Sequence, residues 1–145
     1  MIAIDTNILI YAHRQDFAQH RAAKDALNAL HTSQKNWAIP VVCLHEFLSQ
    51  VTGFRAPYTP TPVKDAFMQI RVWMQSETMT LLRPTEQHID VLEKVVTHGQ
   101  ARGGQIHDAR IAAICLENGV RQLWTADRDF ARFAQLLPTH NPVEA

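Results

Sequence analysis

The chain has 145 residues, of which 14 are basic, 14 are acidic and 46% are apolar. This length and apolar content predict a globular domain with its own core, and they exclude a disordered or low-complexity chain. The balanced charge excludes a large basic surface that binds nucleic acid through many phosphates, so a nucleic acid would be bound locally or through a metal ion.

Neither a membrane span nor an exported protein is predicted. No apolar run approaches the ~18 residues of a transmembrane helix, and the N-terminus lacks the basic start of a signal peptide. Cys43 and Cys115 show neither the spacing of paired metal ligands nor a disulfide framework. We therefore expect two buried thiols in a reducing cytoplasm.

The first third of the chain predicts strand, helix, helix, strand and helix. Residues 2–4 (IAI) have the β-branched pattern of a buried strand, and Asn7 is expected to cap a helix over residues 8–13. Apolar spacing predicts an amphipathic helix over residues 16–33. In residues 36–51 (NWAIPVVCLHEFLSQV) a strand is expected to end at the proline, where the next helix begins.

A loop and a second group of strands and helices follow. One glycine and three prolines predict an exposed loop over residues 53–62. The inward face of the next helix is predicted to consist of Val63, Phe67, Ile70 and Met74. Residues 79–82 (MTLL) predict a third strand, and a further helix is marked by Ile89, Leu92 and Val96.

The last third predicts a helix, a strand and a short helix. The segment HDARIAAICLENG contains the first of these, with Gly119 as its C-cap and an inward face of Ile111, Ala112, Cys115 and Leu116. Residues 122–125 predict a fourth strand, residues 128–136 a short helix, and residues 138–145 a C-terminal tail. The alternation predicts an α/β fold over residues 1–145 as a single domain, with a central parallel sheet flanked by helices in three layers. The strand order stays open.

Acidic residues fall where parallel strands end. Asp5 directly follows the first strand, and Asp127 lies two residues beyond the fourth. The carboxyl ends of strands form the ligand crevice of an open parallel sheet. Glu46, about two turns into its helix, and Asp108, which opens another helix, are compatible with the same edge.

Each acid also has a simpler interpretation. Asp5, Asp108 and Asp127 can each cap a helix, and Glu46 can be a solvated helix residue. However, two carboxylates ~5 Å apart repel by about 3 kcal/mol at an effective dielectric of ~20, so four of them need a cation or protonation. Oxygen ligands suit Mg²⁺ or Mn²⁺, which would activate a water and polarise a phosphodiester for hydrolysis.

Four segments in order carry a family resemblance. They are IDTNILI, HEF, DARIAA and TADRDF, which begin at residues 4, 45, 108 and 125. Together they resemble the PIN-domain nucleases, specifically the VapC-like toxins of bacterial toxin–antitoxin pairs, from Ile2 to Phe130. The resemblance implies a Mg²⁺- or Mn²⁺-dependent endoribonuclease that cuts tRNA or ribosomal RNA. It also implies a homodimer and a cognate antitoxin that covers the active site.

The resemblance implies roles for individual positions. The catalytic and metal-binding acids of the family match Asp5, Glu46, Asp108 and Asp127. Its supporting positions match Asp129, Thr6, Asn7 and Thr125. For both threonines a local hydrogen bond to the backbone is an equally good interpretation, and Asn7 is most simply a helix cap.

Basic and aromatic residues near these motifs are candidate RNA contacts. Arg55 and Tyr58, in the proline-rich loop, can contact phosphate and stack on a base, although a solvated loop without such a role is favoured. Near the acids, ion pairing with carboxylates is favoured over phosphate binding for Arg102, Arg110 and Arg128.

Other functions have less support. A zinc site could use His45 and His107, but adjacent side chains on a helix diverge by about 100°, and no HExxH motif is present. An aspartyl phosphatase would need a second acid where Asn7 stands, and no GxSxG motif of a serine hydrolase occurs. The remaining alternative is a catalytically inactive PIN-like module that docks protein or RNA, which the four filled acidic positions argue against.

Overall fold

The computed structural model describes residues 1–144 and contains one parallel sheet. Its strands are β1 (Ile2–Ile4), β2 (Trp37–Pro40), β3 (Met79–Leu82), β4 (Gln122–Trp124) and β5 (Thr139–His140). The strand order is β3-β2-β1-β4-β5, and every neighbouring pair is parallel. The chain therefore extends the sheet in one direction from β1 to β3 and in the other from β1 to β5.

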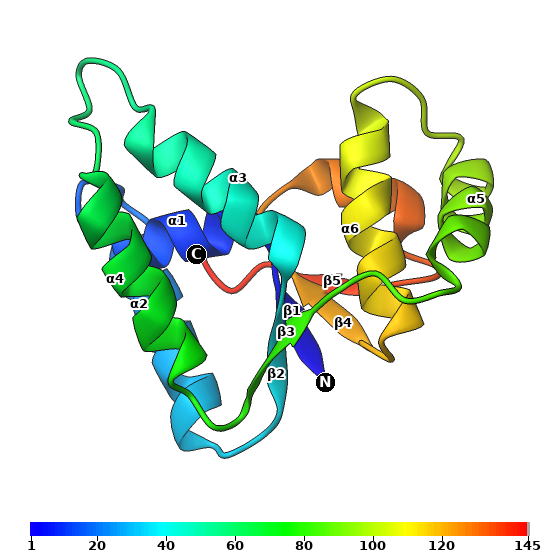
Figure 1. Ribbon diagram of the computed structural model, residues 1–145, viewed down its shortest axis with the longest axis horizontal. Coiled ribbons are helices and arrows are strands. Elements are labelled where there is room, and N and C mark those ends of the chain that lie inside the picture. The colour runs from blue at the N-terminus through cyan, green and yellow to red at the C-terminus, as the bar shows by residue number, and fades with distance from the viewer. Residues whose placement is uncertain (145) are drawn as a thin grey trace.

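Helices flank this sheet on both sides. They are α1 (Thr6–His13), α2 (His20–Thr32), α3 (Val41–Thr52), α4 (Val63–Met74), α5 (His88–Gly99), α6 (Gln105–Glu117) and the 3₁₀ helix η1 (Arg128–Phe133). Figure 1 shows α1 to α4 gathered on one side of the central strands and α5 and α6 on the other. This arrangement confirms the predicted three-layer α/β/α fold with a parallel sheet.

The central strand β1 is held rigidly by the core. Ala3 and Ile4 are fully buried, and large side chains from both helical layers, among them Phe47 and Phe130, are also buried. Burying one such side chain stabilises a fold by roughly 1.5–3 kcal/mol. The backbone at the carboxyl end of β1 is therefore a fixed platform for Asp5.

The first helix begins earlier than predicted. Its N-cap is Asp5 and not Asn7, because the Asp5 carboxylate accepts a hydrogen bond of 2.7 Å from the backbone N–H of Thr6. Residues 16–19 do not belong to α2, which begins at His20. Instead, the Arg14 guanidinium donates to the Asp16 carboxylate and to the carbonyl oxygen of Thr59, so this segment forms a turn against the proline-rich loop.

The predicted inward face of α4 was wrong in part. Ile70 is buried as expected, but its buried neighbours on α4 are Ala66 and Trp73, and Trp73 packs edge-to-face on Phe47 with ring centroids 5.0 Å apart. The side chains of Val63, Phe67 and Met74 are instead 59%, 44% and 49% exposed. Both stripes have helical spacing, and the fit of the Trp73 ring against α3 decides between them.

The fifth strand was not predicted. Its backbone continues the sheet, since the N–H of Leu123 donates to the carbonyl of Pro138 at 2.9 Å and the N–H of Thr125 donates to that of His140 at 2.9 Å. A strand of two residues is too short to show an alternation of apolar and polar side chains. The segment was therefore predicted as part of the C-terminal tail.

Expectations from the sequence also concerned the cysteines and the lengths of the helices. Cys43 and Cys115 are buried free thiols, as expected. Within residues 1–144, no helix is both long enough and apolar enough to cross a membrane.

Candidate active site

The carboxyl ends of β1 and β4 bring two of the sequence motifs together. The pairing of Ile4 with Trp124 places the next residues, Asp5 and Thr125, side by side. The Asp5 N–H donates to the carbonyl oxygen of Trp124 at 3.0 Å, and the Thr125 hydroxyl donates to Asp5 Oδ2 at 2.7 Å. Residues 120 positions apart in the chain thus form one hydrogen-bonded unit.

Asp5 is a buried carboxylate surrounded by donors. Its side chain accepts from the Thr6 N–H, from Asn7 Nδ2 at 3.1 Å, from the Thr125 hydroxyl and, weakly, from Cys43 Sγ at 3.8 Å. Burial raises the pKa of Asp5 to about 6, although the bonds from Thr125 and Thr6 lower it. Asp5 is therefore both the cap of α1 and an acid whose negative charge is costly in this position.

Asn7 and Thr125 also shape the loop that carries Asp127. Asn7 Oδ1 accepts from the N–H of Ala126 at 3.0 Å, and Thr125 Oγ1 accepts from the N–H of Asp127 at 3.0 Å. The predicted local hydrogen bond to the backbone is therefore confirmed for Thr125. In addition, the Thr125 hydroxyl donates its hydrogen to Asp5. Asn7 was expected to cap α1, but it lies in the first turn of this helix and connects it to the loop after β4.

Glu46 reaches the same edge from α3. Its Oε2 accepts from the hydroxyl of Thr6 at 2.8 Å, and its Oε1 lies 3.4 Å from Arg110 Nη2. Thr6 thus holds a second acid of the motif set, and Arg110 forms the ion pair that was favoured for it.

The other acids form the tightest cluster. Among residues 1–144, one group of three acidic, histidine or cysteine side chains has ligand atoms that all lie within 4.8 Å of one another: Asp108, Asp127 and Asp129. Asp127 caps η1 by accepting from the N–H of Asp129 at 2.9 Å, whereas Asp108 lies in the first turn of α6 without capping it. Asp129, expected only as a supporting residue, is a full member of this cluster.

Within residues 1–144, the Asp108 carboxyl accepts no hydrogen bonds like those that surround Asp5. Burial, followed by the charges of Asp127, Asp129 and Glu46, raises its pKa to about 6, and the charge of His107 opposes this rise. A cation bound between these carboxylates would relieve this repulsion. Half-buried oxygen donors of this kind suit Mg²⁺ or Mn²⁺, so the residues fit the ion that the sequence predicted.

Metal-free protein should become more stable as the solution is made mildly acidic. The folded pKa of Asp5, about 6, exceeds its ordinary 3.8, so the folded state binds the proton more tightly than the unfolded state does. From pH 7.5 to pH 5 the linkage from Asp5 alone adds roughly 1.4 kcal/mol to the free energy of unfolding, and it is lost as pH rises through 6. The raised pKa of Asp108 adds a smaller, solvent-screened change of the same sign. Urea unfolding in EDTA at the two pH values measures the change, and a free energy that falls on acidification would contradict the assignment.

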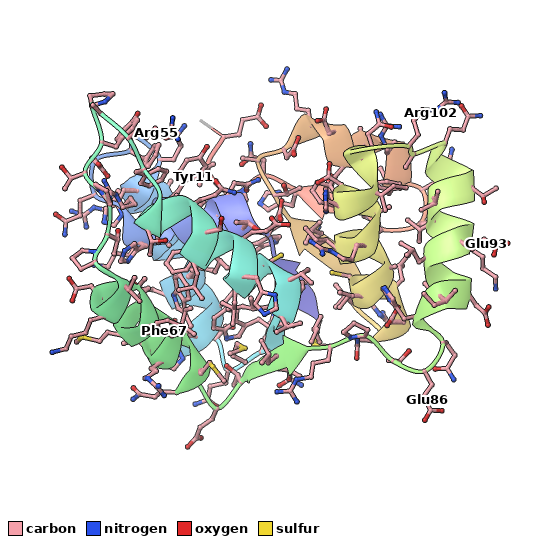
Figure 2. All side chains as sticks on the ribbon, turned by 45° about the horizontal axis from the view of Figure 1, so that its top comes forward. Tyr11, Arg55, Phe67, Glu86, Glu93 and Arg102 are labelled. Atoms are coloured by element: carbon pink, nitrogen blue, oxygen red, sulfur yellow. The ribbon has the colours of Figure 1, made fainter. Side chains whose placement is uncertain are left out.

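Within the described residues, the remaining candidates form no hydrogen bond or ion pair with the clustered acids. His45 and His107, the zinc candidates, are exposed. The Tyr58 ring stacks on Phe17 with centroids 5.1 Å apart, so one of its faces is occupied. Figure 2 shows Arg55 on the loop beyond α3 and Arg102 beside α6, at opposite ends of the molecule. Arg128 is exposed between Asp127 and Asp129 in the chain and has no ion pair within the described residues.

Comparison with known proteins shows the family of the chain. The chain matches the PIN domain family over residues 2–136. It is 34% identical over 140 residues to Ribonuclease VapC43 of Mycobacterium tuberculosis, an alignment that covers 97% of this chain and 95% of that protein.

Solved structures share the fold. VapBC2 from Rickettsia felis, crystallised with a DNA fragment from its promoter, has a TM-score of 0.70 at 17% identity and covers 97% of this chain and 98% of its own. Mycobacterium tuberculosis VapC20, described as a sarcin-ricin loop cleaving toxin, has a TM-score of 0.64 at 18% identity and covers 90% of this chain and 93% of its own. The ordered acidic motifs, the sheet that gathers them and these matches place the chain in the PIN-domain family, among its VapC-type proteins.

Proposed function

We propose that this protein is a toxin-like, divalent-metal-dependent endoribonuclease that hydrolyses phosphodiester bonds of RNA and is inhibited by a cognate antitoxin. The observation that carries the proposal is the clustering of Asp108, Asp127 and Asp129. Glu46 is close enough to this cluster and to Asp5 for its charge to raise the pKa of both Asp108 and Asp5. The relative VapC43 is named a ribonuclease. The proposal treats residues 1–145 as a single PIN domain.

The catalytic and metal-binding residues of this proposal are acidic. They are Asp5, Glu46, Asp108 and Asp127, with Asp129 joining the cluster. A Mg²⁺ or Mn²⁺ ion held by them would supply Lewis-acid polarisation of the phosphodiester and a more acidic water. The protein's own contribution is to hold these carboxylates together in a partly dry environment, where their affinity for a cation is raised.

Hydrogen-bonding side chains keep the acids in place. Thr125 and Asn7 bind Asp5 and also hold the loop of Asp127, while Thr6 binds Glu46. In our proposal these three are supporting residues that fix the positions of the acids. Residues that orient metal ligands typically contribute about 10–100-fold to metal affinity or activity.

For the substrate we propose tRNA or ribosomal RNA. Arg128 is exposed beside the acidic cluster and is the favoured phosphate contact. Arg55 and Tyr58 stay lower-ranked candidates, because the ring of Tyr58 is already stacked on Phe17. The near-neutral charge of the chain fits recognition of one structured loop better than binding along a duplex.

The proposed partners are an antitoxin and a second copy of the chain, in the cytoplasm. Large apolar side chains are exposed along α4, namely Val63, Phe67, Met68, Val72 and Met74. Beside them, a cavity of about 570 Å³ lies between α2 and α4, over Trp37 and Trp73. Exposed apolar surface of this kind is typical of protein interfaces, and buried free thiols are compatible with the reducing cytoplasm.

Cleavage of RNA in vitro tests the proposal. We expect purified protein to produce discrete cuts in total tRNA or ribosomal RNA with Mn²⁺ or Mg²⁺, and we expect EDTA to abolish them. Sequencing of the new ends would identify the substrate. A folded protein that neither cuts RNA nor binds Mn²⁺ would favour the alternative, an inactive PIN-like module that docks protein or RNA.

A further inference from the structure

An ion pair connects the two helical layers across the acidic site. Arg110 of α6 contributes Nη2 and Glu46 of α3 contributes Oε1, 3.4 Å apart. Figure 1 shows α3 and α6 on opposite sides of the central strands, above the end of β1. The pair therefore spans the edge where the other acids gather.

This contact has the features of an exchangeable one. Its length is near the upper limit of a hydrogen bond, and the side chains of Arg110 and Glu46 are 36% and 30% exposed. Arg110 Nε is buried without a hydrogen-bond partner among the described residues, so the guanidinium is not locked in a fork-shaped, two-bond geometry. The opposite oxygen of Glu46, Oε2, is held more tightly by Thr6 at 2.8 Å.

The charges around this pair are unbalanced. Burial raises the pKa of Asp5 and of Asp108, and the neighbouring acids add to both rises, with Glu46 among them in each case. In the part of the chain that the structure describes, Arg110 is the basic side chain that forms an ion pair with one of these acids. It thus supplies part of the positive charge that the site lacks.

We propose that Arg110 is a positioning residue that acts through Glu46: it serves as the internal counter-ion of Glu46 in the metal-free protein and competes with a divalent ion for it. This inference rests on the metal site proposed above. Thr6 keeps Glu46 at the site edge, and Arg110 keeps its Oε1 occupied until an ion neutralises the acids. Arg110 therefore lowers the affinity for the ion and at the same time limits repulsion among the acids when no ion is bound.

Direct Mn²⁺ binding to the purified chain tests this role, with calorimetry or electron paramagnetic resonance as the readout. We expect Arg110→Gln to tighten Mn²⁺ binding roughly fivefold, because it removes a positive charge that opposes a divalent ion. Arg110→Lys keeps the charge and should bind as the wild type does. Arg121→Gln is the matched control, since Arg121 is exposed at the amino end of β4, away from the acids, and should change affinity less than about twofold.

A double-mutant cycle shows whether the effect passes through Glu46. In a Glu46→Gln background, Arg110→Gln should change Mn²⁺ affinity much less than in the wild type. Unchanged or weaker Mn²⁺ binding by Arg110→Gln, or an equal gain in both backgrounds, would overturn the inference while leaving the metal site intact. Absence of Mn²⁺ binding by the wild-type chain would instead overturn the proposed function, and the inference with it.

Discussion

Replacing Asp108 by Asn is expected to abolish RNA cleavage without unfolding the protein. Asp108 belongs to the three-acid cluster, and even the partners that orient metal ligands contribute about 10–100-fold, so loss of a ligand should cost on the order of a hundredfold or more. The change should not harm the fold, because within residues 1–144 no hydrogen bond to the carboxylate contributes to its pKa. Cleavage assays and urea unfolding in EDTA measure the two effects.

The matched control for this variant is Asp90→Asn. Asp90 is also in the first turn of a helix, α5, and its side chain is exposed. The Asp90→Asn protein should cleave RNA at the wild-type rate. If Asp108→Asn retained activity, or if it lost several kcal/mol of stability in EDTA, Asp108 would be a structural residue and the proposed metal site would lose its centre.

Adding Mn²⁺ or Mg²⁺ is expected to stabilise the wild-type protein strongly. An ion at about 100 times its Kd adds roughly 2.7 kcal/mol to the free energy of unfolding, because it binds the folded state alone. For a chain of this size the melting temperature should rise by about 5–10 °C. Thermal unfolding with and without the ion measures the shift, and Asp108→Asn should remove most of it.

The same stabilisation should depend on pH in a defined direction. The pKa values of Asp5 and Asp108 are both about 6, so below pH 6 a proton competes with the ion for each carboxyl. Apparent affinity should weaken roughly tenfold per titrating carboxyl between pH 7 and pH 5. A melting temperature that rises equally with Mn²⁺ at pH 5 and pH 7.5, or equally in Asp108→Asn, would show that the ion binds elsewhere.

The structure also shows why Asp5 is a less decisive site for mutation than its place in the sequence suggests. Its oxygens accept from Thr6, Asn7, Thr125 and Cys43. An amide nitrogen in place of Oδ2 would face two donors, from Asn7 and Thr125, and would lose both bonds. This cost opposes the gain from removing a buried charge, so loss of activity in Asp5→Asn would mix a chemical effect with a structural one.

Local rules were enough for the class of fold and for most elements. The buried strand at residues 2–4, the proline that separates β2 from α3 and the proline-rich loop at 53–62 all lie where the sequence predicted them. Each depends on neighbouring residues, through β-branching, the restricted backbone of proline or apolar spacing. The alternation of strands and helices then predicts a parallel sheet, because parallel strands need crossover connections.

The sequence by itself determined the fold class and a set of acids expected at one edge of a parallel sheet. Tertiary structure alone decided which acids meet: Asp108, Asp127 and Asp129 cluster, while Asp5 and Glu46 are held beside them by donors and by Arg110. Tertiary structure also decided which face of α4 is buried, and it formed the two-residue strand β5 at the edge of the sheet. The physical reason is the distance along the chain over which the interactions act. Caps, turns and periodicity act over a few residues, whereas the position of a carboxylate at this site depends on packing and hydrogen bonds between residues up to 120 positions apart.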